Sequence, residues 1–138
     1  MITQLLIGLA ALAASVAVHG AFMQAAIAFF RHVEAGHRSG FEKWALTAGV
    51  VLWFFLSICV ICWGWSMLLI YLGAIEGLEE ALYFSTVTFT TLGYGDVVLG
   101  TDWRLLGAFM AGNGTIIVGW TTAMVFVAVR QIYDGMDE

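Results

Sequence analysis

Proline is absent from this chain of 138 residues, which also has only two cysteines and five lysines and arginines. No low-complexity tail or internal repeat is present either. So few basic side chains, with a formal net charge of −5, do not fit a protein that binds nucleic acid. The three histidines and two cysteines form no catalytic constellation, so the sequence does not predict an enzyme. An arginine-repeat helix of the kind that senses voltage is also missing.

Apolar residues, in contrast, make up 62% of the chain, far more than a soluble domain of this size carries. Three apolar segments, at residues 2–30, 44–75 and 103–129, each exceed the roughly 20 residues that a helix needs to cross a bilayer. The N-terminus has no basic side chain and the first run is long, so we interpret it as a spanning helix and not as a signal peptide. Cys59 and Cys62 lie inside the second segment, where thiols behave as small apolar groups.

The first segment has two contrasting faces on a helical wheel. Alanines form one stripe, which favours close packing against another helix in lipid. They are Ala10, Ala14, Ala17, Ala21, Ala25 and Ala28. His19 lies on nearly the opposite face, about halfway along the span. An ionisable group at that depth indicates a function, so His19 is a candidate pH sensor. The alternative is a neutral histidine that is hydrogen-bonded to Ser15 or to a neighbouring helix.

Residues 31–43 form the main polar stretch and carry three of the five lysines and arginines. The positive-inside rule places this linker in the cytoplasm. The N-terminus is then outside, and the short tail at residues 131–138 is cytoplasmic. Arg31, Arg38 and Lys43 are candidates for binding anionic lipid head groups. Alternatively, these residues determine the topology only.

A short helix is expected between the second and third segments. We expect Gly77 to end the second helix and residues 79–90 to form about three turns, too few to span a bilayer. Glu79 and Glu80 in the first turn complement the positive end of the helix dipole. The C-terminal end would point toward the membrane centre, where its partial negative charge favours a cation.

Residues 91–95, Thr-Leu-Gly-Tyr-Gly, follow this helix directly. A permeating potassium ion must lose its water, and rings of backbone carbonyls from four chains can replace that water. Turning successive carbonyls to one side requires φ values that glycine adopts cheaply, which fits Gly93 and Gly95. The Thr91 hydroxyl can add an innermost ligand, while Leu92 and Tyr94 would point outward into the surrounding packing.

Residues 81–85 and 90–96 resemble the pore helix and selectivity filter of potassium channels of the two-helix pore-domain superfamily. The resemblance covers roughly residues 44–130, and residues 1–30 would be an extra N-terminal helix of a prokaryotic member. It implies a potassium-selective channel in the bacterial inner (plasma) membrane, with K⁺ as the permeant ion and no cofactor. The ion ligands that it implies are the carbonyls of Thr91, Leu92, Gly93 and Tyr94 and the hydroxyl of Thr91.

The resemblance also implies roles for residues around the filter. Thr90 and Asp96 would support it, and Tyr83 stands where an aromatic donor to Asp96 is usual. Many bacterial members have a glutamate behind the filter that bonds to the aspartate. Val87 occupies that place here, so such a pair cannot form. The usual proline after the filter is also missing.

The third segment resembles the pore-lining inner helix of the family, over residues 103–130. Gly114 falls where a hinge glycine is expected, and close packing against the pore helix is the alternative. Asn113 would either line the cavity or cap a buried backbone group. The candidate cavity residues are Thr115, Val118 and Thr122, and the candidate hydrophobic gate is Phe126.

One chain supplies one filter strand, so the expected assembly is a fourfold homotetramer. One alternative is a weakly selective cation channel with the same fold, which the intact Gly93-Tyr94-Gly95 disfavours. The other is an accessory subunit of a potassium uptake system, which would pair filter repeats within a longer chain. Without a voltage sensor or a ligand-binding domain, we expect gating to come from the filter, the third helix, lipid or pH.

Overall fold

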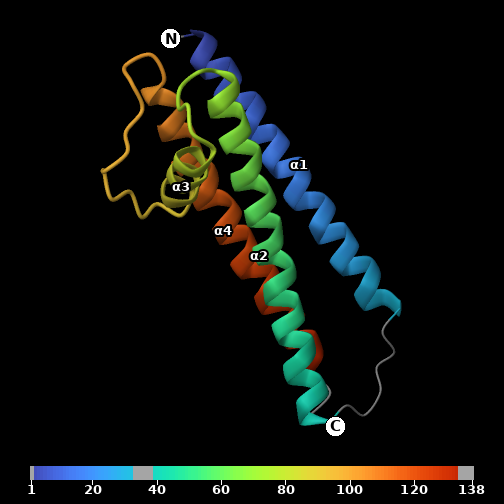
Figure 1. Cartoon of the computed structure of the whole chain (residues 1–138). Coiled ribbons are helices and arrows are strands. Elements are labelled where there is room, and N and C mark those ends of the chain that lie inside the picture. Colours follow the sequence, from blue (N-terminus) through green and yellow to red (C-terminus); the bar gives the residue numbers. More distant parts are fainter. Residues whose placement is uncertain (1, 33–38, 134–138) are drawn as a thin grey trace.

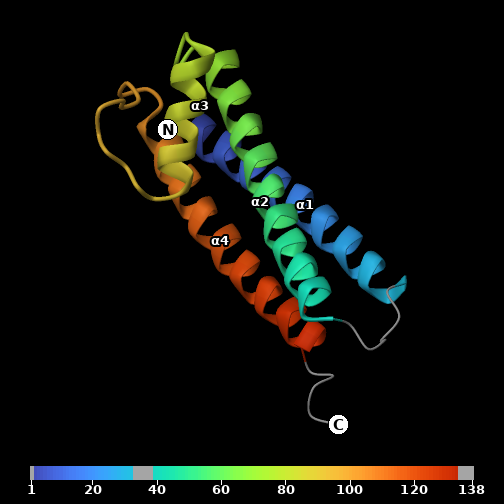
Figure 2. The same ribbon diagram turned by 60° about the horizontal axis from the view of Figure 1, so that its bottom comes forward.

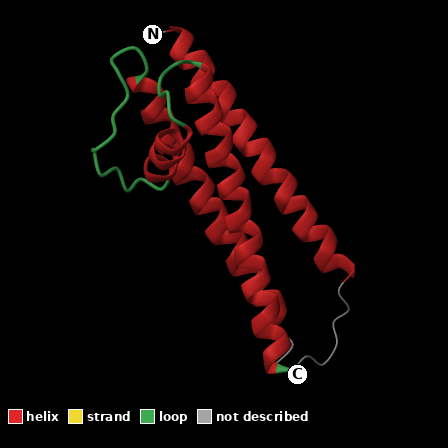
Figure 3. Cartoon of the chain, viewed as in Figure 1, coloured by secondary structure: helices red, strands yellow, loops and turns green. Residues whose placement is uncertain are grey.

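The computed structural model describes residues 2–32 and 39–133, and these residues form helices and loops without strands (Figure 3). Three of the helices are long and apolar enough to cross a membrane. The expected all-α architecture, with three long helices and a short one before the last, is confirmed. In chain order the helices are α1 (Ile2–His32), α2 (Gly40–Tyr71), α3 (Leu78–Phe89) and α4 (Arg104–Tyr133).

The long helices α1, α2 and α4 lie side by side, and α3 packs against α2 and α4 near one end of the bundle (Figures 1 and 2). That end also holds the N-terminus, whereas α4 finishes at the opposite end (Figure 1). A core of buried apolar side chains joins α2, α3 and α4, and Leu69, Phe89 and Met110 are examples of its fully buried members on the three helices. The short helix is therefore held by two spans of its own chain.

The second span begins at Gly40 and not at the expected Trp44. Ser39 caps it: the Glu42 amide donates to the Ser39 hydroxyl at 3.3 Å, and the Ser39 amide donates to the Glu42 carboxylate at 3.0 Å. This reciprocal capping box satisfies two amides that the first helical turn leaves unpaired. The basic linker expected at residues 31–43 is thus shorter, because residues 40–43 belong to α2 and residues 31–32 to α1. Residues 33–38 lie outside the described residues.

The second span ends at Tyr71, so the expectation that Gly77 ends it is wrong. The helix is closed by a Schellman motif, which places one residue in the left-handed region. Gly73 takes that position, with a φ of 65° that glycine adopts without a steric penalty. Gly77 instead is the N-cap of α3. The two bonds of the motif run from Gly73 N–H to the Ile70 carbonyl (3.0 Å) and from Ala74 N–H to the Leu69 carbonyl (2.9 Å).

The packed face of α1 carries Gly8, Ser15 and His19, all of which are buried. The six alanines of the opposite stripe are exposed, so the prediction that this stripe packs is wrong for contacts within the chain. Polar groups explain the choice of face, because lipid offers no hydrogen bonds and they must find partners inside the protein. Gly8 also allows a close approach, since a Cβ there would lie 2.8 Å from the Phe109 ring.

His19 connects α1 to both neighbouring spans. Its Nδ1 lies 2.9 Å from the Ser57 hydroxyl on α2, and its Nε2 lies 3.4 Å from the Thr121 hydroxyl on α4. The imidazole also packs edge-on against Trp120, with ring centroids 5.0 Å apart. Ser15 donates to a carbonyl of its own helix instead. The expected hydrogen bond from His19 to a neighbouring helix is confirmed, and its role as a pH sensor stays a prediction.

Replacing Gly8 by alanine is expected to loosen α1 from α4, because overpacking of this kind destabilises by about 1–3 kcal/mol. Gly20→Ala is the matched control, since its Cβ would meet only Trp120, at 3.9 Å. In thermal unfolding of the purified protein in detergent, only Gly8→Ala should lower the midpoint. Equal midpoints for the two variants would contradict the proposed close approach of α1 and α4.

Candidate functional site

The short helix α3 has 12 residues and is much too short to cross a bilayer. Glu79 and Glu80 lie in its first turn, as expected, where their charges complement the helix dipole. The Ser66 hydroxyl of α2 lies 3.3 Å from the Ala81 carbonyl and ties this first turn to the neighbouring span. The site is therefore built on a helix whose start and direction are fixed by α2.

The C-terminal end of α3 repeats the Schellman motif that closes α2, with Thr91 in the position that Gly73 takes there. The Thr91 amide donates to the Thr88 carbonyl at 3.0 Å, and the Leu92 amide donates to the Val87 carbonyl at 2.9 Å. The Gly93 amide also donates to the Val87 carbonyl, at 3.2 Å. The extended segment at residues 91–95 forms no sheet, and we call it the strand for its shape alone; it starts with three amides bound to the last turn of α3.

Thr91 has a φ of 61°, and among the described residues it is the one non-glycine residue with a positive φ. A β-branched side chain in this region is strained by about 1–3 kcal/mol, which glycine would avoid. Such strain is retained where the side chain has a task. Sequence reasoning missed this conformation because it sought positive φ at glycines only, although the position directly after a short helix was a usable signal.

Gly93 and Gly95 have φ values of 52° and 81°, so the expected left-handed conformation at both is confirmed. A Cβ at either position would meet nothing within 4 Å in this chain. The backbone angle, and not crowding within the chain, is therefore what requires glycine here. Positive φ occurs at residues 91, 93 and 95, that is, at every second residue of the strand.

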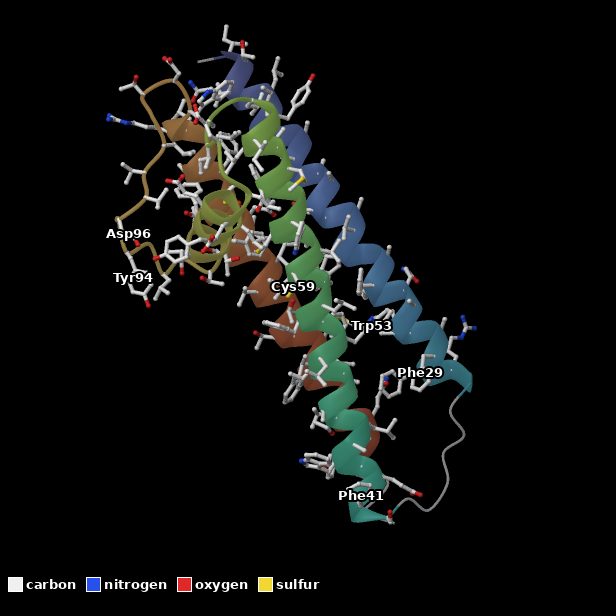
Figure 4. The ribbon with its side chains drawn as sticks, viewed as in Figure 1. Phe29, Phe41, Trp53, Cys59, Tyr94 and Asp96 are labelled. Carbon is white, nitrogen blue, oxygen red and sulfur yellow. The ribbon has the colours of Figure 1, made fainter. Side chains whose placement is uncertain are left out.

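The side chains between these residues face away from the bundle. Leu92 is 56% exposed and Tyr94 is 68% exposed. Tyr94 and Asp96 project from the loop between α3 and α4, away from the three spans (Figure 4). A groove of about 470 Å³ lies between this loop, α3 and the start of α4, and Gly93, Gly95 and Leu99 contribute to its lining. Apolar and aromatic surface at the loop is thus left open by a single chain.

Tyr83 and Asp96 fasten the loop to α3, as expected. The Tyr83 hydroxyl donates to Asp96 Oδ2 at 2.6 Å, and the Val97 amide donates to Oδ1 at 3.0 Å. The hydrogen bond from Tyr83 holds the pKa of Asp96 below its usual value, and the same bond raises the pKa of Tyr83. Thr90, the other candidate support, donates its hydroxyl to the Thr86 carbonyl of its own helix at 2.8 Å.

Gly114 brings the backbone of α4 against the end of α3. A Cβ at this position would lie 1.7 Å from the Phe89 carbonyl oxygen, which is closer than any atom can approach. Gly112 and Gly119 on the same helix would meet nothing within 4 Å. Close packing against the pore helix, one of the two alternatives for Gly114, is therefore confirmed, and a hinge at this residue stays a prediction.

The candidate cavity and gate residues of α4 lie together on the face that the other helices leave open. Val118 is 40% exposed and Phe126 is 68% exposed. Thr115 and Thr122 are also exposed, and their hydroxyls donate to carbonyls one turn back on the same helix. The structure therefore brings these residues to one stripe, and their functions as cavity lining and gate stay predictions.

Asn113 does not lie on that stripe. It is fully buried within the single chain, and neither its amide oxygen nor its amide nitrogen has a hydrogen-bond partner among the described residues. The alternative that Asn113 lines an open cavity is therefore wrong, because the single chain already buries its side chain. No described backbone group is capped by it either. An unpaired buried amide is unfavourable, and an ordered water is its usual partner in such a position.

Three apolar spans, a short helix that stops within the bundle and a loop with alternating left-handed residues define a pore-forming integral membrane protein. The profile of a family described as ion channels matches residues 53–131, which is more than half of the chain. The chain belongs to this ion channel family. The match leaves out α1 and the first part of α2. Searches of curated proteins and of solved structures found no match.

Gly114→Ala is expected to displace α4 from the end of α3 and to destabilise the protein by at least about 1–3 kcal/mol. Gly112→Ala is the control, because its added methyl meets open space and alanine favours a helix. Thermal unfolding in detergent should separate the two variants clearly. If Gly114→Ala unfolds at the same temperature as Gly112→Ala, the contact with the Phe89 carbonyl does not constrain α4.

Tyr83→Phe is expected to raise the pKa of Asp96 toward its ordinary value. With Tyr83 present the carboxylate pKa is lowered, so the interaction is complete above the ordinary pKa and is lost as the pH falls through the lowered pKa. Carboxyl ¹³C chemical shifts of Asp96, followed from neutral to acid pH, measure this directly. Tyr71→Phe, at the exposed end of α2, is the control and should leave the titration unchanged. Identical titrations for wild type and Tyr83→Phe would refute the bond.

Proposed function

We propose that the chain is the subunit of a potassium-selective channel whose filter is the strand at residues 91–95. The observation that carries this proposal is the positive φ at every second residue of the strand, at Thr91, Gly93 and Gly95. An alternation of left-handed and ordinary residues turns successive carbonyls toward one side of the strand. A ring of such carbonyls replaces the hydration shell of a potassium ion.

Thr91 contributes to the same proposal through its side chain. A glycine would close the helix at that position without strain, so a retained threonine fits a ligand whose hydroxyl lies below the first carbonyl ring. The K⁺ ligands are then the carbonyls of Thr91, Leu92, Gly93 and Tyr94 and the Thr91 hydroxyl. The permeant ion is the one bound species that the mechanism requires.

Four copies of the chain around a common axis complete the ring, because one chain supplies one strand. The open surfaces of the single chain support this arrangement. Tyr94 and Leu92 expose large side chains at the loop, and α4 exposes the stripe from Thr115 to Phe126. In a fourfold assembly these surfaces meet neighbouring subunits or face the central cavity, while α2 and α1 stay peripheral.

The proposed orientation places the filter at the outer mouth. Basic residues gather between α1 and α2 and at the end of α4, which the positive-inside rule assigns to the cytoplasm. The proposed filter lies in the half of the bundle that also holds the N-terminus, away from the end of α4 (Figures 1 and 4). The acidic residues Glu79, Glu80 and Asp96 then face the outside, where they concentrate cations. A bacterial inner membrane fits this arrangement.

Reversal potentials of the reconstituted protein in opposed potassium and sodium gradients test the proposal. A potential close to the potassium equilibrium value is expected. A value near zero would instead indicate the weakly selective alternative.

Gly93→Ala is expected to abolish selective conduction, because alanine at φ 52° is strained by about 1–2 kcal/mol and its methyl crowds the ring.

Gly100→Ala provides the control for that variant. Gly100 lies in the same loop, its φ is not in the left-handed region, and a Cβ there meets nothing within 4 Å. This variant should conduct like the wild type. Selective flux that survives in Gly93→Ala would refute the role of the backbone angle.

A further inference from the structure

The helices α1 and α4 enclose a groove near the ends that lie farthest from the filter. Figures 1 and 2 show α1 diverging from the other two spans toward its C-terminal end. The groove has a volume of about 530 Å³ and lies within the apolar length of both helices. Its apolar lining includes Ala26, Ile27 and Phe30 of α1 and Met124 and Val127 of α4.

Polar side chains occur at one end of this groove only. Arg31, in the last turn of α1, and Gln131, in the last turn of α4, are its two polar lining residues. Among the described residues, no carboxylate lines the groove. The groove therefore combines an apolar channel, one cation and one amide at the level where two parallel spans leave the membrane.

The neighbouring cleft between α1 and α2 differs in charge. It is larger, at about 790 Å³, but the carboxylate of Glu42 lies in its lining. Lys43 does not line this cleft, and its ammonium lies 5.7 Å from the centroid of the Tyr133 ring on α4. Arg38 lies outside the described residues. Of the two expected basic contacts for lipid that the structure describes, Arg31 and Lys43, Arg31 is the one that lines a groove whose described lining contains no acid.

We propose that the groove between α1 and α4 binds an anionic phospholipid. One acyl chain fills the apolar channel, and the phosphate pairs with the Arg31 guanidinium while the Gln131 amide donates to it. Guanidinium groups bind phosphate through two parallel N–H donors, and such charge-assisted bonds are the strong ones at a membrane surface. An arginine at the end of a span reaches the head-group level in this way.

Charge complementarity favours this occupant over a helix from a second copy of the chain. A second copy seated in the groove would bury Arg31 against apolar side chains, and an unpaired buried cation is strongly unfavourable. A lipid phosphate supplies the negative charge that the described lining of the groove does not contain. The proposed site does not depend on which ion the pore conducts.

Native mass spectrometry of the full-chain assembly in detergent tests the proposal. Phosphatidylglycerol and phosphatidylcholine with the same acyl chains are added separately, and the lipid retained per subunit is counted. Both lipids carry a phosphate, but the choline ammonium of phosphatidylcholine neutralises its charge, so phosphatidylglycerol should be retained about fivefold more tightly beside Arg31. Arg31→Gln should reduce its retention to the level of phosphatidylcholine. Ile27→Trp, which fills the channel, should reduce the retention of both lipids.

Two controls accompany these variants. Arg104→Gln removes an arginine at the opposite end of α4, and Ala21→Trp adds bulk on the exposed stripe of α1. Neither should change lipid retention. Equal retention of the two lipids by the wild type, or undiminished phosphatidylglycerol on Arg31→Gln, would overturn the proposal. A change in assembly mass without a change in lipid retention for Ile27→Trp would also overturn it, because the groove would then be an interface between copies.

Discussion

The carbonyl of Val87 accepts two amide hydrogens, from Leu92 and Gly93, and this pair of bonds joins the end of α3 to the segment at residues 91–95, the proposed filter. The bonds end α3 and fix the direction of the next residues. They also require a left-handed residue at Thr91, the position where α2 uses Gly73. A helix that ends in this way aims its partial negative charge at the start of the strand, where a cation is stabilised. The residues that end α3 are therefore the same residues for which we propose ion binding.

The remainder of the chain holds this junction in place. Gly114 lets α4 approach the last turn of α3 more closely than any side chain would allow, and Tyr83 ties the far end of the strand back through Asp96. His19 links α1 to α2 and α4, although α1 lies outside the matched family region. Glycine is required for two different reasons. At Gly8 and Gly114 a side chain would collide with a neighbouring helix, whereas Gly93 and Gly95 adopt a left-handed backbone.

Hydropathy and the Thr-Leu-Gly-Tyr-Gly run predicted most of what positions the site. The number of spans, the short helix and the left-handed Gly93 and Gly95 follow from local sequence patterns, and the Tyr83–Asp96 bond was implied by the resemblance to potassium channels. The packed face of α1 could not be predicted from the alanine stripe, because burial followed the polar His19 and Ser15 instead. The predicted end of α2 was too far along the chain, because two glycines lie close together. The hydrogen bonds of the folded chain show that Gly73 closes α2 and that Gly77 begins α3.

Contacts between distant residues marked the limit of sequence reasoning. The buried Asn113, the approach of Gly114 to the Phe89 carbonyl and the groove between α1 and α4 depend on which helix faces which. A single sequence does not carry that information, because several faces of each span are equally apolar. The strained Thr91 is different, since it could have been inferred from its place after a short helix.

Residues 91–95 of four chains are proposed to form one path of backbone ligands for potassium. Anomalous diffraction from crystals of the full chain grown with Tl⁺ in place of K⁺ tests it most directly. Peaks are expected on a fourfold axis at the levels of the carbonyls from Thr91 to Tyr94. An assembly without fourfold symmetry, or a fourfold axis without Tl⁺ peaks along this strand, would contradict it.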